Sequence, residues 1–278
     1  MKKIIYFLLL LLPILSYSQQ QESKLQQELK KLNWIDGPSS GEIGDKAKIQ
    51  IPQNYVFLGA QDTKKYIELM GNPPVDNHYL IAPKDLHWFA VFSFNPSGYV
   101  KDDEKIDADE LMKNLKEGDV KSNEERKRLG MHALYTDGWQ VPPHYDPSTK
   151  RLEWGVRLRD ESGAMNINYT SRLLSRTGVM NAILVSDTET LQNDTNEYKT
   201  TLKNFNFVSG ESYSEFKEGD HVAEFGLAAL ILGGAAAVAT KKGFWTVIVG
   251  FFAAFWKLIA GAVIAVLASI GSLFKKKE

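Results

Sequence analysis

The longest apolar stretch of the sequence restricts the possible folds more than any other feature. Residues 244–274 make up 31 residues with a single charge, at Lys257, and three lysines at 275–277 follow. A helix of this length reaches about 46 Å, whereas the hydrocarbon core of a bilayer is about 30 Å thick. The stretch therefore predicts a transmembrane helix within residues 244–274, as part of a membrane anchor region over residues 221–278.

A second apolar segment, residues 225–240, precedes this helix and is followed by Lys241 and Lys242. Because basic residues favour the cytoplasmic side, a single crossing with the C-terminus in the cytoplasm satisfies the terminal lysines best. A hairpin of the two segments is the alternative, with Lys241 and Lys242 in its turn. In either arrangement Lys257 is expected to extend toward an interface, since an ammonium at the bilayer centre costs about 2.5–3.5 kcal/mol.

Small residues recur at every fourth position in both apolar segments. They are Ala229, Gly233, Ala237, Gly261, Ala265 and Ser269. Such stripes let helices approach closely within lipid, either in a hairpin or between copies of the chain. The alternative explanation is that Ala and Gly are simply common in membrane helices.

The other end of the chain reads as a secretory signal peptide. Two lysines precede a twelve-residue apolar run at 4–15, and Ser16 and Ser18 place small residues at a cleavage site. Twelve helical residues span about 18 Å, too little to cross a bilayer. We therefore expect residues 1–18 to be removed on export, with an uncleaved anchor as the alternative.

The residues between the two ends are acidic and contain no cysteine. From 19 to 220 there are 32 acidic and 25 basic residues, and the net charge of the whole chain is −1. This balance gives no reason to expect a nucleic-acid partner. The absence of cysteine from the sequence excludes disulfides, thiolate zinc sites and cysteine nucleophiles. We expect a soluble domain over residues 19–220, in the periplasm of a protein held in the inner membrane.

Hydrophobic periodicity predicts an α+β domain with a mostly antiparallel sheet covered by helices. Helices are expected over residues 23–34, 62–70 and 191–202, with further helix starts at Asp107 and Ser122. Strands are expected over residues 47–52, 78–82, 87–94, 131–134, 152–158, 165–169, 179–185 and 205–207. The strand 179–185 is apolar on both faces and should be central, and 152–158 should pair with 165–169 as a hairpin.

The candidate ligand-binding residues come from a stiff aromatic loop predicted at 137–146 and from two later arginines. They are Trp139, Tyr145, Asp146, Arg172 and Arg176. Rigid aromatics beside a carboxylate suit recognition of a peptide or glycan, and the arginines could bind an anion, pair with Asp146 or be solvated. The alternative is that Trp139 and Tyr145 cap the sheet core while Asp146 starts a turn. No catalytic motif, cofactor motif or metal-ligand spacing is present, so no catalytic residue, cofactor or metal is predicted.

Five segments occur in an order that resembles a known family. They are GWQVPPHYD, LEWG, NYTSRLLSRTGVMN, FKEGD and GLAALILGGAAA, ahead of the C-terminal hydrophobic helix. The series is similar to the bacterial membrane-anchored family called domain of unknown function 2167. This resemblance implies an envelope protein with a C-terminal anchor and supplies no catalytic residues. The order of elements also resembles the sandwich of the photosystem oxygen-evolving subunit P and Mog1 type.

The leading functional prediction is a non-enzymatic binding or interaction module, anchored in the membrane and facing the periplasm. Its expected partners are the lipid bilayer and either an envelope protein or a second copy of the chain. An envelope hydrolase or metal-dependent enzyme is one alternative. An oligomeric membrane-assembly or adaptor protein is the other.

Overall fold

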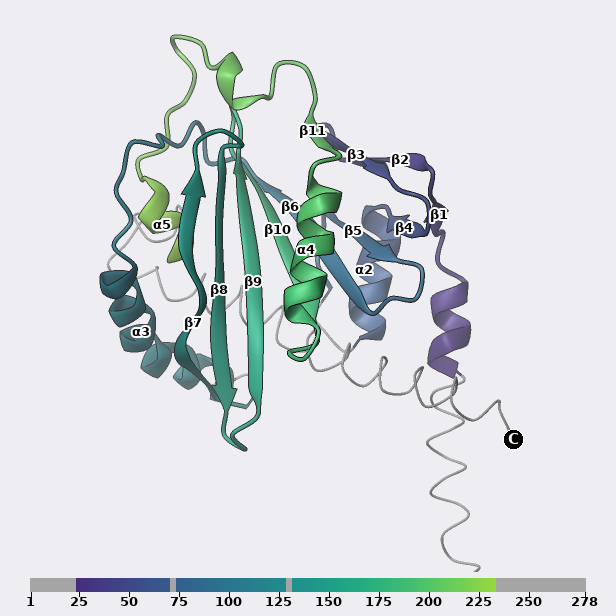
Figure 1. Ribbon diagram of the computed structural model, residues 1–278, viewed down its shortest axis with the longest axis horizontal. Coiled ribbons are helices and arrows are strands. Elements are labelled where there is room, and N and C mark those ends of the chain that lie inside the picture. The colour runs from purple at the N-terminus through teal and green to yellow at the C-terminus, as the bar shows by residue number, and fades with distance from the viewer. Residues whose placement is uncertain (1–23, 71–73, 129–131, 234–278) are drawn as a thin grey trace, which may run out of the picture.

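The computed structural model describes residues 24–70, 74–128 and 132–233 (Figure 1). Several predictions made from the sequence fall outside these ranges: the signal peptide at 1–18, the transmembrane helix within 244–274, and the stripe residues Ala237, Gly261, Ala265 and Ser269. In the described part of the chain, no helix combines the length and apolar character needed to cross a bilayer.

The described residues are organised around an eight-stranded sheet in which every neighbouring pair is antiparallel. The strand order is β1-β4-β5-β6-β10-β9-β8-β7. The strands are β1 (Ile35–Asp36), β4 (Tyr55–Leu58), β5 (His78–Pro83), β6 (Trp88–Asn95), β7 (Leu134–Asp146), β8 (Arg151–Asp160), β9 (Met165–Leu174) and β10 (Val179–Ser186). The prediction of a mostly antiparallel sheet with helices is therefore confirmed.

One face of this sheet is covered by helix α4 (Leu191–Leu202) and by a small second sheet. The second sheet has the order β11-β3-β2, with β2 at Ser39–Ile43, β3 at Ala47–Ile51 and β11 at Phe205–Phe207. Figure 1 shows α4 in front of β9 and β10, with the small sheet at the upper right.

The opposite face of the sheet is covered in two parts. Helix α2 (Ala60–Leu69) and the helical residues 24–30 pack over the β4–β6 half. Helix α3 (Ala108–Arg128) and the short helix α5 (Leu227–Ile231) pack over the β7–β9 half. The 3₁₀ turn η1 (Tyr213–Glu215) contributes Tyr213 to this second cluster.

The central strands bury both faces because their side chains alternate between two apolar layers. On β6, Trp88, Ala90 and Phe92 face α4, whereas Phe89 and Val91 face α2. Strand β10 lies between β6 and β9, so the prediction of a central strand at 179–185 is confirmed. The predicted hairpin of 152–158 with 165–169 is the observed β8–β9 pair.

Several local predictions are wrong. The helix predicted over residues 23–34 ends at residue 30, and of the described residues in the strand predicted at 131–134, only Leu134 belongs to the sheet, where β7 begins. Residues 137–146, predicted as a loop, belong to strand β7, whose register shifts absorb Pro142 and Pro143 at the edge of the sheet. Ser122, predicted to start a helix, is buried inside the continuous helix α3. Asp107 does cap that helix, because its Oδ1 accepts hydrogen bonds from the backbone amides of Asp109 and Glu110.

Candidate functional site

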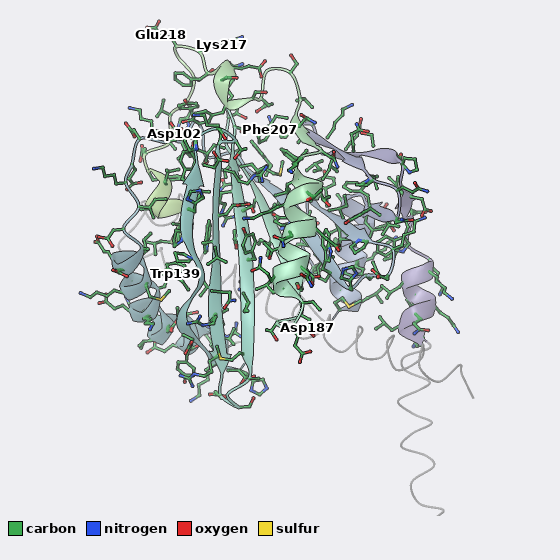
Figure 2. All side chains as sticks on the ribbon, viewed as in Figure 1. Asp102, Trp139, Asp187, Phe207, Lys217 and Glu218 are labelled. Carbon is green, nitrogen blue, oxygen red and sulfur yellow. The ribbon has the colours of Figure 1, made fainter. Side chains whose placement is uncertain are left out.

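Trp139 is held by contacts within its own chain. Its indole Nε1 donates a hydrogen bond to the carbonyl oxygen of Ala108 at 3.0 Å, and its ring packs against the apolar cluster under α3. Figure 2 shows Trp139 on the α3 side of the sheet. Both the apolar body and the polar atom of this side chain are therefore occupied.

Tyr145 belongs to a cluster centred on Asp102, near the loops at the top of Figure 2. Its hydroxyl donates to Asp102 Oδ2 at 2.6 Å, Lys150 Nζ donates to the same oxygen at 2.8 Å, and the Tyr213 hydroxyl donates to Oδ1 at 3.0 Å. Burial raises the pKa of Asp102, but these hydrogen bonds outweigh it and leave the pKa lowered. Burial and the Asp102 carboxylate both raise the pKa of Tyr145. The cluster ties three distant segments together.

Asp146 begins the turn between β7 and β8. Its side chain accepts hydrogen bonds from the backbone amide and hydroxyl of Ser148 and from the hydroxyl of Thr149. These bonds lower the pKa of Asp146 to about 2. These contacts agree with the alternative drawn from the sequence, in which Trp139 and Tyr145 cap the core and Asp146 starts a turn.

The two arginines occupy separate environments. Arg172 lies on β9 with 7% of its surface exposed, and its guanidinium is 5.5 Å from the Trp154 ring centroid. Burial lowers the pKa of Arg172 to about 10. Arg176 donates from Nε and Nη2 to the two oxygens of Asp220, each at 2.7 Å, and this pairing lowers the pKa of Asp220 to about 2.

Of the five predicted ligand-binding residues, two, Tyr145 and Arg172, lie at matching positions on the same face of the sheet, on either side of strand β8. Tyr145 pairs with Leu152 on β8, and Leu152 pairs with Arg172 on β9, so all three share one face of the sheet. Trp139, Asp146 and Arg176 have separate partners. The binding role of these residues stays a prediction.

In the small-residue stripe, Ala229 lies in α5, whereas Gly233 lies beyond the end of that helix with φ 118°.

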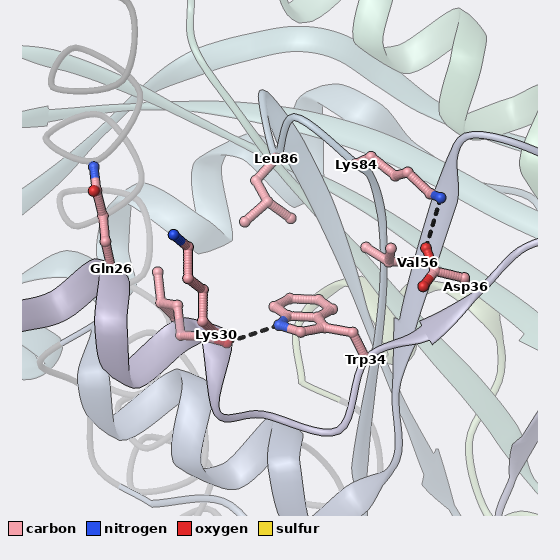
Figure 3. A pocket seen from close by; sticks show the side chains of 8 residues that line it. Gln26, Lys30, Trp34, Asp36, Val56, Lys84 and Leu86 are labelled. Atoms are coloured by element: carbon pink, nitrogen blue, oxygen red, sulfur yellow. Dashed lines mark hydrogen bonds and ion pairs between the residues drawn. The ribbon is translucent and has the colours of Figure 1, made fainter. Parts of the chain in front are cut away.

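A cavity of about 470 Å³ lies on the other half of the molecule (Figure 3). Three separate segments line it: the helical residues 24–30 with the strand that follows, β4, and the turn between β5 and β6. The lining residues are Gln26, Leu29, Lys30, Trp34, Asp36, Val56, Lys84 and Leu86. We call this cavity the Trp34 pocket.

The apolar wall of the Trp34 pocket is built around the Trp34 indole, whose orientation is fixed by two contacts. Trp34 Nε1 donates to the carbonyl oxygen of Leu29 at 2.8 Å, and the indole meets Tyr66 edge-on with ring centroids 6.0 Å apart. Both contacts hold the ring beside Leu29 and Val56. Trp34 is half-buried, so the indole packs on the protein on one side and lines the pocket on the other.

Leu86 lines the pocket from a strained backbone position. Its φ of 57° lies in the left-handed region, which a branched apolar residue rarely adopts. The turn is closed by a hydrogen bond from the Leu86 amide to the carbonyl oxygen of Pro83 at 2.9 Å. Strain of this kind costs about 1–3 kcal/mol and is enriched at functional sites. Leu86 shares a positive φ with Asn54, Asn77 and Lys150, but it is the one of these four that lines the pocket.

Charged side chains stand around this apolar wall. Lys84 Nζ lies 2.6 Å from Asp36 Oδ1, and the two side chains are 48% and 65% exposed. Lys30 is exposed, and within the described ranges no carboxylate pairs with it. Figure 3 shows the Lys30 and Lys84 ammonium groups on either side of Trp34 and Leu86.

Comparison with known families decides where the chain belongs. The model of the family described as Protein of unknown function (DUF2167) matches residues 35–267. The chain belongs to the DUF2167 family. The match begins beside Trp34, so it covers β4 and the β5–β6 turn of the pocket and starts after the helical residues 24–30.

Comparison of this DUF2167 chain with solved structures finds cyanobacterial PsbP (CyanoP) from Synechocystis sp. PCC 6803, studied in solution. The identity is 9% and the TM-score 0.33, over 63% of this chain and 91% of the cyanobacterial one. A TM-score this low does not establish a common fold, so the PsbP-type sandwich stays a prediction. Comparison with curated proteins gives no match.

The DUF2167 chain also has a polar cluster beside α4 that its sequence did not indicate. His87 Nδ1 lies 2.6 Å from Asp85 Oδ1, while Nε2 lies 3.6 Å from both Asp194 and Glu197. Trp88 Nε1 donates to the same Glu197 oxygen at 3.0 Å. No group of three or more His, Asp or Glu residues in the described part of the chain is arranged to hold a metal ion.

Proposed function

We propose that this DUF2167 protein is an envelope binding protein, held at the membrane by its C-terminal segment, that takes an apolar group into the Trp34 pocket. The soluble domain faces the periplasm in this proposal. Binding, rather than chemistry on the bound molecule, is the activity assigned to the pocket.

The observation that carries the proposal is the apolar wall of the pocket, set beside a strained turn. Leu29, Trp34 and Val56 present apolar surface to a space of about 470 Å³, within the range of small-molecule sites. Burying apolar surface contributes about 25 cal/mol per Å². The positive φ of Leu86 supports a functional role, because the chain keeps a costly conformation that directs an apolar side chain into this space.

The membrane part of the proposal is supported by the sequence alone. The apolar residues 244–274 are long enough to span a bilayer, and the basic residues at 275–277 favour a cytoplasmic end. Membranes washed with carbonate should retain the protein. Reporter fusions after Thr240 and after Glu278 should report opposite sides of the membrane for a single crossing. Release by carbonate would contradict the anchor.

The binding part can be tested with decanol and decanoate as probes. The full chain is placed in nanodiscs of zwitterionic lipid, and tryptophan fluorescence is followed as each probe is added. We expect a saturable change that Trp34→Phe abolishes and Trp139→Phe retains. Subtracting the Trp34→Phe signal removes any contribution from probe dissolved in the lipid.

Leu86→Gly separates a binding role from a folding role. Glycine accepts a positive φ without strain, so this change relieves the backbone while removing an apolar wall residue. We expect affinity for both probes to fall about fivefold, with a free energy of unfolding within about 1 kcal/mol of the native value. Unchanged affinity in Leu86→Gly, or no saturable response in the native chain, would contradict a pocket of this function.

A further inference from the structure

We propose that the ligand of the Trp34 pocket is a free single-chain amphiphile with a carboxylate head, and that Lys30 is the residue that recognises this head. The inference rests on the proposed binding function and adds the chemical class of the ligand. It is carried by the charges around the apolar wall.

Lys30 has the properties expected of a headgroup partner. Its side chain lines the pocket, and the residue one helical turn earlier on the same side is Gln26, which is neutral. The nearby Glu28 is engaged by Lys31, whose Nζ lies 2.5 Å from Glu28 Oε1. In the described part of the chain the Lys30 charge is therefore not balanced by a carboxylate, which leaves it available to an anion at the edge of the apolar wall.

Lys84 is a weaker second contact. Its pair with Asp36 is exposed on both sides, and exposed ion pairs contribute about 0–1 kcal/mol. Lys84 can therefore turn from Asp36 toward a bound anion at little cost. With Lys30 on one side of Trp34 and Lys84 on the other, the apolar wall has a positive charge near each end (Figure 3).

The size of the pocket favours one alkyl chain over the two chains of a membrane phospholipid. Its volume is about 470 Å³, and four of its eight lining side chains are apolar: Leu29, Trp34, Val56 and Leu86. A cationic head is disfavoured by like charge, and a neutral head gains nothing from Lys30. Charge complementarity thus selects a small anionic head on a single chain, and a carboxylate is the head of this kind that we propose.

Three probes of ten-carbon chain length test the inference. Decanoate and decyltrimethylammonium are used below the concentrations at which they form micelles, and decanol below its solubility limit. The full chain in zwitterionic nanodiscs should bind decanoate about fivefold more tightly than it binds decanol. It should bind decyltrimethylammonium most weakly of the three. The preference for decanoate should shrink as the concentration of sodium chloride is raised from about 20 mM to about 500 mM, because salt screens the exposed charges.

Lys30→Gln should remove the preference, weakening decanoate about fivefold while decanol affinity stays constant. Lys31→Gln is the matched control, since Lys31 is the next residue but lines a neighbouring cavity and pairs with Glu28. It should leave both affinities unchanged. An equal loss in the two variants would mean general attraction by charge and would overturn the role of Lys30.

The outcomes separate the two proposals. If decanol and decanoate bind equally to the native chain, the carboxylate inference is wrong and the apolar pocket stands. If neither probe gives a response that depends on Trp34, the proposed binding function fails as well. A response of Trp34 to vesicles of anionic phospholipid, without a response to decanoate, would overturn the single-chain ligand.

Discussion

The β7 region and the Trp34 pocket contain similar residues that differ in how completely their side chains are engaged. Around β7, the indole of Trp139 packs under α3, and both oxygens of Asp102 accept bonds from Tyr145, Lys150 and Tyr213. Around Trp34, one face of an indole lines an open space, and Lys30 has no carboxylate partner in the described ranges. Residue type alone therefore does not mark a binding site. What distinguishes the pocket is that its aromatic and cationic groups are left with capacity to bind.

The largest expected effect tests the structural role of β7. Trp139→Ala should lower the free energy of unfolding by about 2–3 kcal/mol, because it removes a large, partly buried ring and its hydrogen bond to Ala108. Urea denaturation measures the change, and decanoate affinity should stay the same. A loss of affinity with a stability change below about 1 kcal/mol would contradict the structural role of Trp139 and move the binding site to β7.

The Asp102 cluster gives a test that depends on pH. Because the pKa of Asp102 is lowered in the folded chain, its charged carboxylate stabilises the fold at pH values above about 3.9, the pKa of an aspartate in the unfolded chain. This stabilisation is lost as the pH falls through the lower pKa that Asp102 has in the folded chain. Asp102→Asn should therefore cost about 2 kcal/mol at pH 7. The difference from the native chain should shrink below about pH 4.

Denaturant unfolding at a series of pH values measures this difference. Asp103→Asn changes an exposed neighbour and is the matched control, expected to have little effect. The difference in free energy of unfolding between Asp102→Asn and the native chain could instead stay constant down to about pH 2. That result would show that the carboxylate charge is not what joins the three segments.

The smallest expected effect concerns the rim of the pocket. Asp36→Asn should change the free energy of unfolding by less than about 1 kcal/mol, because the Asp36–Lys84 pair is exposed. Decanoate affinity should rise about twofold, since Lys84 is released and a negative charge is removed. Fluorescence titration with decanoate measures this change in affinity. Weaker decanoate binding would mean that Asp36 helps to hold the pocket open rather than competing for Lys84.

Local pattern was sufficient for much of the fold. The alternation of apolar and polar residues placed β8 and β9, the two-sided apolar run placed β10 at the centre, and Asp107 marked the start of α3. The prediction for residues 137–146 failed because two prolines among aromatic and acidic residues suggested a stiff loop. An edge strand with register shifts accepts these residues, and no local pattern reveals that a strand lies at an edge.

The candidate site was accessible to sequence reasoning only in fragments. The apolar spacing of Leu25, Leu29 and Leu32 predicted the helix that forms one wall of the pocket. Nothing near Trp34 in the sequence indicates that Val56 and Leu86 complete the wall, or that Lys84 reaches Asp36. Leu86 carries no local signal for a positive φ, because leucine is not a residue that favours it.

The antiparallel α+β character of the domain and its membership in the DUF2167 family could both be inferred from the sequence, which also predicts a transmembrane helix near the C-terminus. The fold class follows from hydrophobic periodicity, and the family from the order of motifs. Which charged and aromatic groups already have partners is visible only in the folded chain, since many of those partners lie tens of residues away in the sequence. Asp102 and Tyr213 are 111 residues apart and in contact, whereas Lys30 and Glu28 are neighbours whose charges are not joined.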